Sequence, residues 1–155
     1  MKDLTTYREG KIPELDLNSK KKEIFYISPS SIPSRSANSI HVLLQCEAFS
    51  RLGYKVNLFF RRSINSKKKT KQYITNERDI NLKNIKLKSI YTPKDIATSI
   101  FITLRTLPSL FIHRKSLIIS RNLYASYIIS VILRRKIFFE THQLEYGFSR
   151  ILQRK

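Results

Sequence analysis

Three clusters of polar side chains contain residue types that can bind a ligand, and each cluster follows a short apolar run. The first cluster is mostly serine: Ser28, Ser30, Ser31, Ser34, Arg35, Asn38 and Ser39. The other two lie much later in the chain: Ser120, Arg121 and Asn122, then Glu140, His142, Gln143 and Glu145. Hydroxyl, amide, carboxylate, guanidinium and imidazole groups together supply hydrogen-bond donors and acceptors. If the fold brings the clusters together, they predict a ligand-binding site.

Each cluster taken alone also has a purely structural explanation. Serine and asparagine cap helices, and Arg121 can pair with a carboxylate. A single histidine such as His142 is more often structural than chemical. The elements that position the clusters therefore decide between the two interpretations.

The first half of the chain predicts a strand, a helix and a second strand. Residues 24–27 are apolar and β-prone, and the prolines and serines that follow predict a loop. Residues 39–52 have apolar positions at helical spacing, with Asn38 or Ser39 as the N-terminal cap and Gly53 as the end. Residues 56–60 form the second strand. This order predicts a parallel βαβ unit.

The rest of the chain is less regular until residue 117. Residues 63–83 are polar and basic without a sustained period, which predicts a long excursion, and residues 85–91 alternate like an edge strand. Pro93 is expected to open a helix, and residues 96–112 predict a packed helix, with a membrane-surface helix as the second choice. Further elements follow: a strand at 117–119, a helix at 123–133, a strand at 137–139 and a last helix containing Phe148, Ile151 and Leu152.

These elements predict one α/β domain with a doubly wound, mainly parallel sheet of Rossmann-like type. The length of 155 residues fits a single core. In such sheets ligands bind outside the carboxyl ends of the strands. All three clusters are predicted at those ends, so the topology favours a site.

The sequence also excludes several kinds of site. None of the three glycines, Gly10, Gly53 and Gly147, follows the first strand, so neither a dinucleotide fingerprint nor a phosphate-binding P-loop is present. The three histidines and one cysteine lack the spacing of metal ligands, and no metal site is expected. Cys46 lies inside a predicted helix and is a poor candidate nucleophile. A single cysteine also favours a reducing compartment.

Charge is the strongest compositional signal. Thirty Lys and Arg against eleven Asp and Glu give a net charge of +19, which attracts nucleic acid, phosphorylated ligands or an acidic membrane face. A general compositional bias with solvated loops would explain the charge equally well. Residues 1–22 read as a flexible, basic lead-in without a signal-peptide core, and residues 23–155 as the folded domain.

Parts of the chain resemble the amino-terminal domain of family 4 glycosyltransferases with the GT-B fold. The resemblance begins with IFYISPSSIPSRSANSIHV at residues 24–42, followed by CEAF at 46–49 and the Leu-Gly pair at 52–53. It resumes in the same order with ISRN at 119–122 and FETHQLE at 139–145. The match covers about residues 24–153 and is weak between 63 and 112.

The resemblance implies the acceptor-binding half of a retaining enzyme that moves a sugar from a nucleotide-sugar donor to a glycan or lipid-linked acceptor. It implies His142 and Glu140 as catalytic residues, with His142 contacting the transferred sugar and Glu140 orienting His142 or touching substrate. It implies a larger set of substrate-binding residues: Ser30, Ser31, Ser34, Arg35, Asn38, Arg121, Asn122, Gln143 and Glu145. No cofactor is expected, because the nucleotide-sugar is a substrate.

The family's carboxyl-terminal domain, which binds the donor, is absent after Lys155, and the domain is expected to be truncated in or after its last helix. We therefore expect the chain alone to have no appreciable transferase activity. A separately encoded donor domain would be its partner. The resemblance implies a cytoplasmic location and, with the charge, peripheral contact with anionic lipid at the inner membrane face.

The alternative is a basic module that binds nucleic acid or a membrane without catalysis. The net charge and the lysine run at residues 67–71 support nucleic acid. The absence of a recognition helix, an aromatic RNA-stacking motif or a basic helical stripe argues against it.

Overall fold

Five parallel strands form one sheet in the order β3-β2-β1-β4-β5. The computed structural model describes residues 23–91 and 98–140 of the chain. The strands have the following bounds: β1 Glu23–Ile32, β2 Lys55–Arg62, β3 Ile85–Tyr91, β4 Leu117–Ser120 and β5 Phe138–Phe139. The chain therefore has the predicted α/β, Rossmann-like fold, and β3 is an edge strand as expected.

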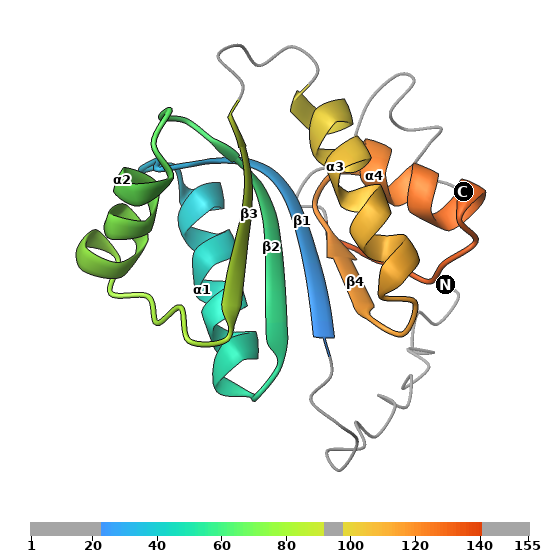
Figure 1. Ribbon diagram of the computed structural model, residues 1–155, viewed down its shortest axis with the longest axis horizontal. Coiled ribbons are helices and arrows are strands. Elements are labelled where there is room, and N and C mark those ends of the chain that lie inside the picture. The colour runs from blue at the N-terminus through green and yellow to red at the C-terminus, as the bar shows by residue number, and fades with distance from the viewer. Residues whose placement is uncertain (1–22, 92–97, 141–155) are drawn as a thin grey trace, which may run out of the picture.

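Helices cover both faces of the sheet (Figure 1). One face carries α1 (Ala37–Arg51), α2 (Lys67–Gln72) and the π-helical turn η1 (Tyr73–Glu77). The other carries α3 (Thr98–Ile112), α4 (Leu123–Tyr127) and the π-helical turn η2 (Ile128–Ile132). The sheet is thus the middle of three layers, which is why its central strands are apolar on both sides.

Alternation along β1 divides the core into two parts. Tyr26 points to the α1 face and packs with Leu58 of β2. Phe25 and Ile27 point to the α3 face and pack with Phe59. All five are at most 1% exposed. This alternation follows directly from the two-residue period of a strand.

The predicted loop after residue 27 is wrong, because β1 continues to Ile32. Its pairing with β2 is interrupted between Ile27 and Ser31 and then resumes. Pro29 falls inside this interruption, so its missing N–H removes no hydrogen bond from the ladder. Ser30 and Ser31 consequently lie in an irregular extension of the central strand.

The prediction for α1 is right about the helix and wrong about its cap. The helix begins at Ala37, and Ser36 is the cap, because its extended backbone lets its side chain accept a hydrogen bond from the Ser39 N–H. Ser39 is buried and donates its hydroxyl to the Ser31 carbonyl, 2.8 Å away. The predicted end is confirmed, since Gly53 has a φ of +87°.

The segment predicted as an excursion is partly helical. Ser66 caps α2, and α2 runs directly into η1. Thr70, Tyr73 and Ile74 are buried against the sheet. These residues lie at positions i, i+3 and i+4, which is helical spacing, and the lysines around them hid this signal.

Arg135 connects the two helical segments on the α3 face. Its guanidinium donates to four backbone carbonyls at the end of α3 and just after it, on Leu110, His113, Arg114 and Ser116, at 2.8 to 3.3 Å. Carbonyls at the end of a helix have no partner within the helix, and a cation there also suits the helix dipole. Arg135 therefore fixes the end of α3 to the segment that follows η2.

Candidate functional site

A charged and polar cluster lies at the carboxyl edge of the sheet, where β4 and β5 end beside β1. Glu140 follows β5, and its carboxylate accepts a hydrogen bond of 2.8 Å from the Tyr26 hydroxyl on β1. The Arg121 Nε, just after β4, lies 3.9 Å from the other Glu140 oxygen. Glu140 is also held by its backbone N–H, which donates to the Ser120 carbonyl at 2.9 Å. The ends of β4 and β5 thus meet a side chain from the middle of β1 at one carboxylate, near the edge that the topology predicts.

The first turns of α1 complete this cluster. Arg121 donates to the backbone carbonyl and to the side-chain oxygen of Asn38, both at 3.4 Å. The His41 Nδ1 lies 4.0 Å from Glu140, and the Tyr26 hydroxyl also contacts the Gln45 side-chain oxygen. Arg121 is 8% exposed, whereas Glu140 is 22% and His41 40% exposed. A ligand can therefore reach the imidazole, the carboxylate and the exposed Asn38.

Burial raises the pKa of the Tyr26 phenol above its ordinary value, and the hydrogen bond to Glu140 raises it further. In the unfolded chain this phenol ionises near pH 10. Above that pH the unfolded state loses a proton that the folded state keeps, so the free energy of unfolding falls as pH rises.

We expect Tyr26→Phe to lower the free energy of unfolding by about 1 kcal/mol at neutral pH, through loss of its hydroxyl hydrogen bond. The variant should also lose stability less steeply above about pH 10, because its ring cannot ionise. Urea unfolding followed by circular dichroism across the alkaline range measures both. Equal alkaline slopes in the two proteins would contradict the assigned role of this phenol.

Asn122 has a structural role. Its side-chain oxygen accepts hydrogen bonds from the N–H groups of Tyr124 and Ala125, which caps α4. Its side-chain nitrogen donates to the Ser99 carbonyl in the first turn of α3, 2.9 Å away. The residue is 2% exposed. Asn122 therefore joins α3 to α4 and does not line a surface site.

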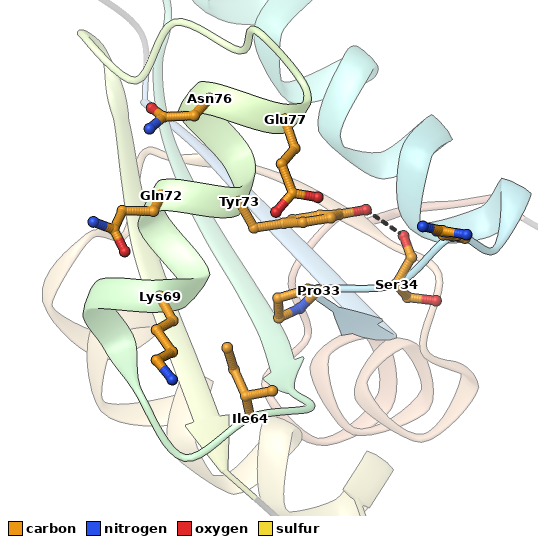
Figure 2. Close-up of a pocket in the computed structure, with 9 residues that line it drawn as sticks. Pro33, Ser34, Ile64, Lys69, Gln72, Tyr73, Asn76 and Glu77 are labelled. Carbon is orange, nitrogen blue, oxygen red and sulfur yellow. Dashed lines mark hydrogen bonds between the residues drawn. The ribbon is translucent and has the colours of Figure 1, made fainter.

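An open pocket of about 680 Å³ lies beside the end of β1 (Figure 2). Its lining comes from the segment after β1, the segment after β2, and the helical α2 and η1: Pro33, Ser34, Arg35, Ile64, Lys69, Gln72, Tyr73, Asn76 and Glu77. Amide, carboxylate and cationic groups surround one aromatic ring. A ligand with several hydroxyl groups and a negative charge fits this combination of donors and acceptors.

Tyr73 fixes one wall of the pocket. Its hydroxyl donates to the Ser34 carbonyl at 2.6 Å, the contact drawn in Figure 2. The same hydroxyl accepts from Arg78 Nε at 2.7 Å, and the Arg78 guanidinium lies 5.2 Å from the ring centroid. These contacts hold η1 against the segment that leads from β1 to α1. The pocket is thus formed before a ligand arrives, which favours binding.

The predicted residues divide into five groups. Ser34 and Arg35 line the pocket, while Asn38, Arg121 and Glu140 form the cluster at the sheet edge. Ser28 of β1 is buried, whereas Ser30 and Ser31 are half-buried; Ser28 donates to Ser30, and the Ser31 carbonyl accepts from Ser39 of α1. Asn122 is buried. His142, Gln143 and Glu145 lie outside the described residues, as do Pro93 and the last predicted helix.

Sequence reasoning missed most of the pocket. Lys69, Gln72, Tyr73, Asn76 and Glu77 all come from the segment predicted as an excursion. The helical spacing of its buried residues would have placed them on one helix, with the polar side chains on its other sides.

Neither a metal centre nor a reactive cysteine is found among residues 23–91 and 98–140. No group of three or more His, Cys, Asp or Glu side chains there could hold a metal ion. Burial raises the pKa of the Cys46 thiol above its ordinary value, which keeps the thiol protonated and inert. Within this part of the chain, hydrogen bonding and charge are the chemistry that the site offers.

The segment between β1 and α1 supplies Ser34 and Arg35 of the polar pocket, and Asn38 of the charged cluster lies in the first turn of α1. Together the pocket and the cluster form a site at the carboxyl edge of a Rossmann-like sheet, the usual ligand-binding position in this fold. No protein-family model, curated protein sequence or solved structure matches this chain.

Proposed function

We propose that this chain is the acceptor-binding half of a retaining glycosyltransferase, which acts with a nucleotide-sugar donor on a glycan or lipid-linked acceptor. The observation that carries the proposal is the polar pocket beside β1, with Arg35 and Lys69 as cations and with amide and carboxylate groups around Tyr73. Sugars present many hydroxyl groups to such side chains, and phosphate groups suit the two cations. The resemblance in residues 24–42, 119–122 and 139–145 supports the same function.

The cluster around Glu140 extends the proposal to the neighbouring sheet edge. The carboxylate is oriented by Tyr26 and Arg121 and remains partly exposed. An oriented carboxylate of this kind can accept a hydrogen bond from a sugar hydroxyl. We place the acceptor in the pocket, with one end reaching toward Glu140.

The proposal is tested by titrating the isotopically labelled chain with oligosaccharides, lipid-linked sugar analogues and nucleoside diphosphate sugars, followed by ¹⁵N–¹H NMR. We expect shift changes around Arg35 and Tyr73 on binding, without turnover, because one half-site binds without completing the reaction. Shift changes confined to a region away from the pocket would contradict the proposed binding position. Turnover by this chain alone would contradict the assignment as half of a site.

Lys69→Ala provides a sharper test of the pocket. Loss of a charge-assisted hydrogen bond to a phosphate-bearing ligand should weaken binding roughly tenfold or more. Lys68→Ala is the matched control, since Lys68 is the exposed neighbour on α2 and does not line the pocket. Equal losses in both variants would show that net charge, and not the pocket, binds the ligand.

A further inference from the structure

α3 is apolar on both of its sides, although only one side packs on the sheet. The buried side includes Ile102 and Leu110, which belong to the core over Phe25 and Phe59. The opposite side carries large apolar residues that are 48 to 78% exposed: Ile100, Phe101, Leu104, Phe111 and Ile112. At 100° per residue these five fall within one arc of the helix, which they share with Arg105 and Pro108. A helix that is apolar all round is normally covered on all sides.

The exposed apolar surface continues onto η2. Val131 and Ile132 are 44% and 66% exposed. A hollow of about 270 Å³ between the two helical segments is lined by Phe111 and Leu133, together with Arg114 and Arg135. We use the name α3–η2 surface for the following residues: Ile100, Phe101, Leu104, Phe111, Ile112, Val131 and Ile132.

Charge on this side of the molecule is predominantly positive, and the Glu23 carboxylate of β1 lies 2.7 Å from the His113 Nδ1. Residues 96–139 contain seven Arg and Lys and no Asp or Glu. The exposed basic residues flank the apolar ones: Arg105, Arg114, Lys115, Arg134 and Lys136. By contrast, Glu47, Glu77 and Asp79 belong to the helices and loops of the α1 face. The two faces of the sheet therefore differ in their charged and exposed apolar residues.

We propose that the α3–η2 surface docks on the face of an anionic lipid membrane, with the apolar side chains among the acyl chains and the basic residues at the headgroups. Apolar residues flanked by lysine and arginine are the pattern of segments that lie in a membrane interface. No helix in the described part of the chain is long and apolar enough to cross a bilayer.

Two other occupants fit these observations less well. A second copy would bring two surfaces of the same positive sign together, which opposes association. Nucleic acid would use the basic residues but would leave the aliphatic side chains of α3 in water. The membrane satisfies both the charge and the apolar area, and the inference does not depend on the glycosyltransferase proposal.

Co-sedimentation of the full chain with vesicles tests this proposal. We expect binding to vesicles of phosphatidylcholine mixed with phosphatidylglycerol, and little binding to phosphatidylcholine alone. The double variant Phe111→Ser/Ile112→Ser should bind the mixed vesicles roughly tenfold more weakly. The matched control is Leu44→Ser/Leu52→Ser, with Leu44 on α1 and Leu52 directly after it, where the exposed fractions are 53% and 69%; it should bind like the unmodified chain.

The charge contribution has its own pair of variants. Arg114→Gln/Lys115→Gln should weaken vesicle binding and reduce its salt dependence, whereas Lys67→Gln/Lys68→Gln on α2 should have a smaller effect. Circular dichroism establishes that each variant is folded.

Three outcomes would overturn the proposal. The first is equal binding by the α3 and α1 double variants. The second is no binding of the unmodified chain to mixed vesicles. The third is an oligomer in sedimentation velocity that Phe111→Ser/Ile112→Ser converts to a monomer while vesicle binding persists, because the surface would then join two copies of the chain.

Discussion

Phe59→Ala is expected to lower the free energy of unfolding by about 3–5 kcal/mol, because it removes an aromatic ring from the centre of the core and leaves a cavity. Phe59 is 1% exposed and stacks on Phe25 with ring centroids 5.7 Å apart. Both rings lie between the sheet and α3. Since whole domains are stable by only about 5–15 kcal/mol, this one change removes a large part of the total.

The measurement is chemical unfolding followed by circular dichroism, since the chain has no tryptophan to serve as a fluorescent probe. Phe101→Ala is the matched control, because Phe101 is the same residue type on the exposed side of α3, at 53% exposure. It should change stability by less than about 0.5 kcal/mol. Similar losses in the two variants would mean that α3 packs with a different side on the sheet.

Asn122→Ala is expected to lower the free energy of unfolding by about 1.5–3 kcal/mol. The change removes the cap of α4, worth about 0.5–2 kcal/mol, and a buried hydrogen bond to the Ser99 carbonyl worth about 1 kcal/mol. Both helices on this face of the sheet then lose a common anchor. Thermal and chemical unfolding measure the loss directly.

Asn122→Ser separates the two contributions. Serine retains an oxygen that can cap α4 but is too short to reach Ser99, so about half of the alanine loss should be recovered. If Asn122→Ser is as unstable as Asn122→Ala, the hydrogen bond to α3 contributes most of the stability that Asn122 provides. If Asn122→Ala left stability unchanged and instead abolished ligand binding, the sequence-based assignment of Asn122 to substrate would be right.

The sheet could be predicted from the sequence because its strands are short apolar runs separated by helical periods. The end of β1 could not be predicted in this way. Pro29 normally argues against a strand, and here it falls where the pairing with β2 is already interrupted. A local rule about one residue cannot reveal whether a neighbouring strand has a gap at that position.

The residues of the candidate site that directly follow strands could be predicted from the sequence. The residues that are brought together only by the packing of helices on the sheet could not. Arg121 and Glu140 meet because parallel strands end at the same edge. The wall of the pocket formed by Tyr73 and Lys69 depends on how η1 packs against β1 and β2. The basic residues in this segment concealed its helical pattern in the sequence. Asn122 was assigned to substrate by resemblance, yet its burial and its hydrogen bonds give it a structural role.

The central place of β1 also has a consequence for the biosynthesis of this protein. β1 pairs with β2 soon after both are made, but its other edge waits for β4, whose Leu117 pairs with Ile24. Until α3 and β4 leave the ribosome, no helix packs on the apolar side chains of Phe25, Ile27 and Phe59. Long-range parallel pairing is slow and exposes apolar edges in the meantime. The nascent first half is therefore the stage at which a chaperone would protect this chain from aggregation.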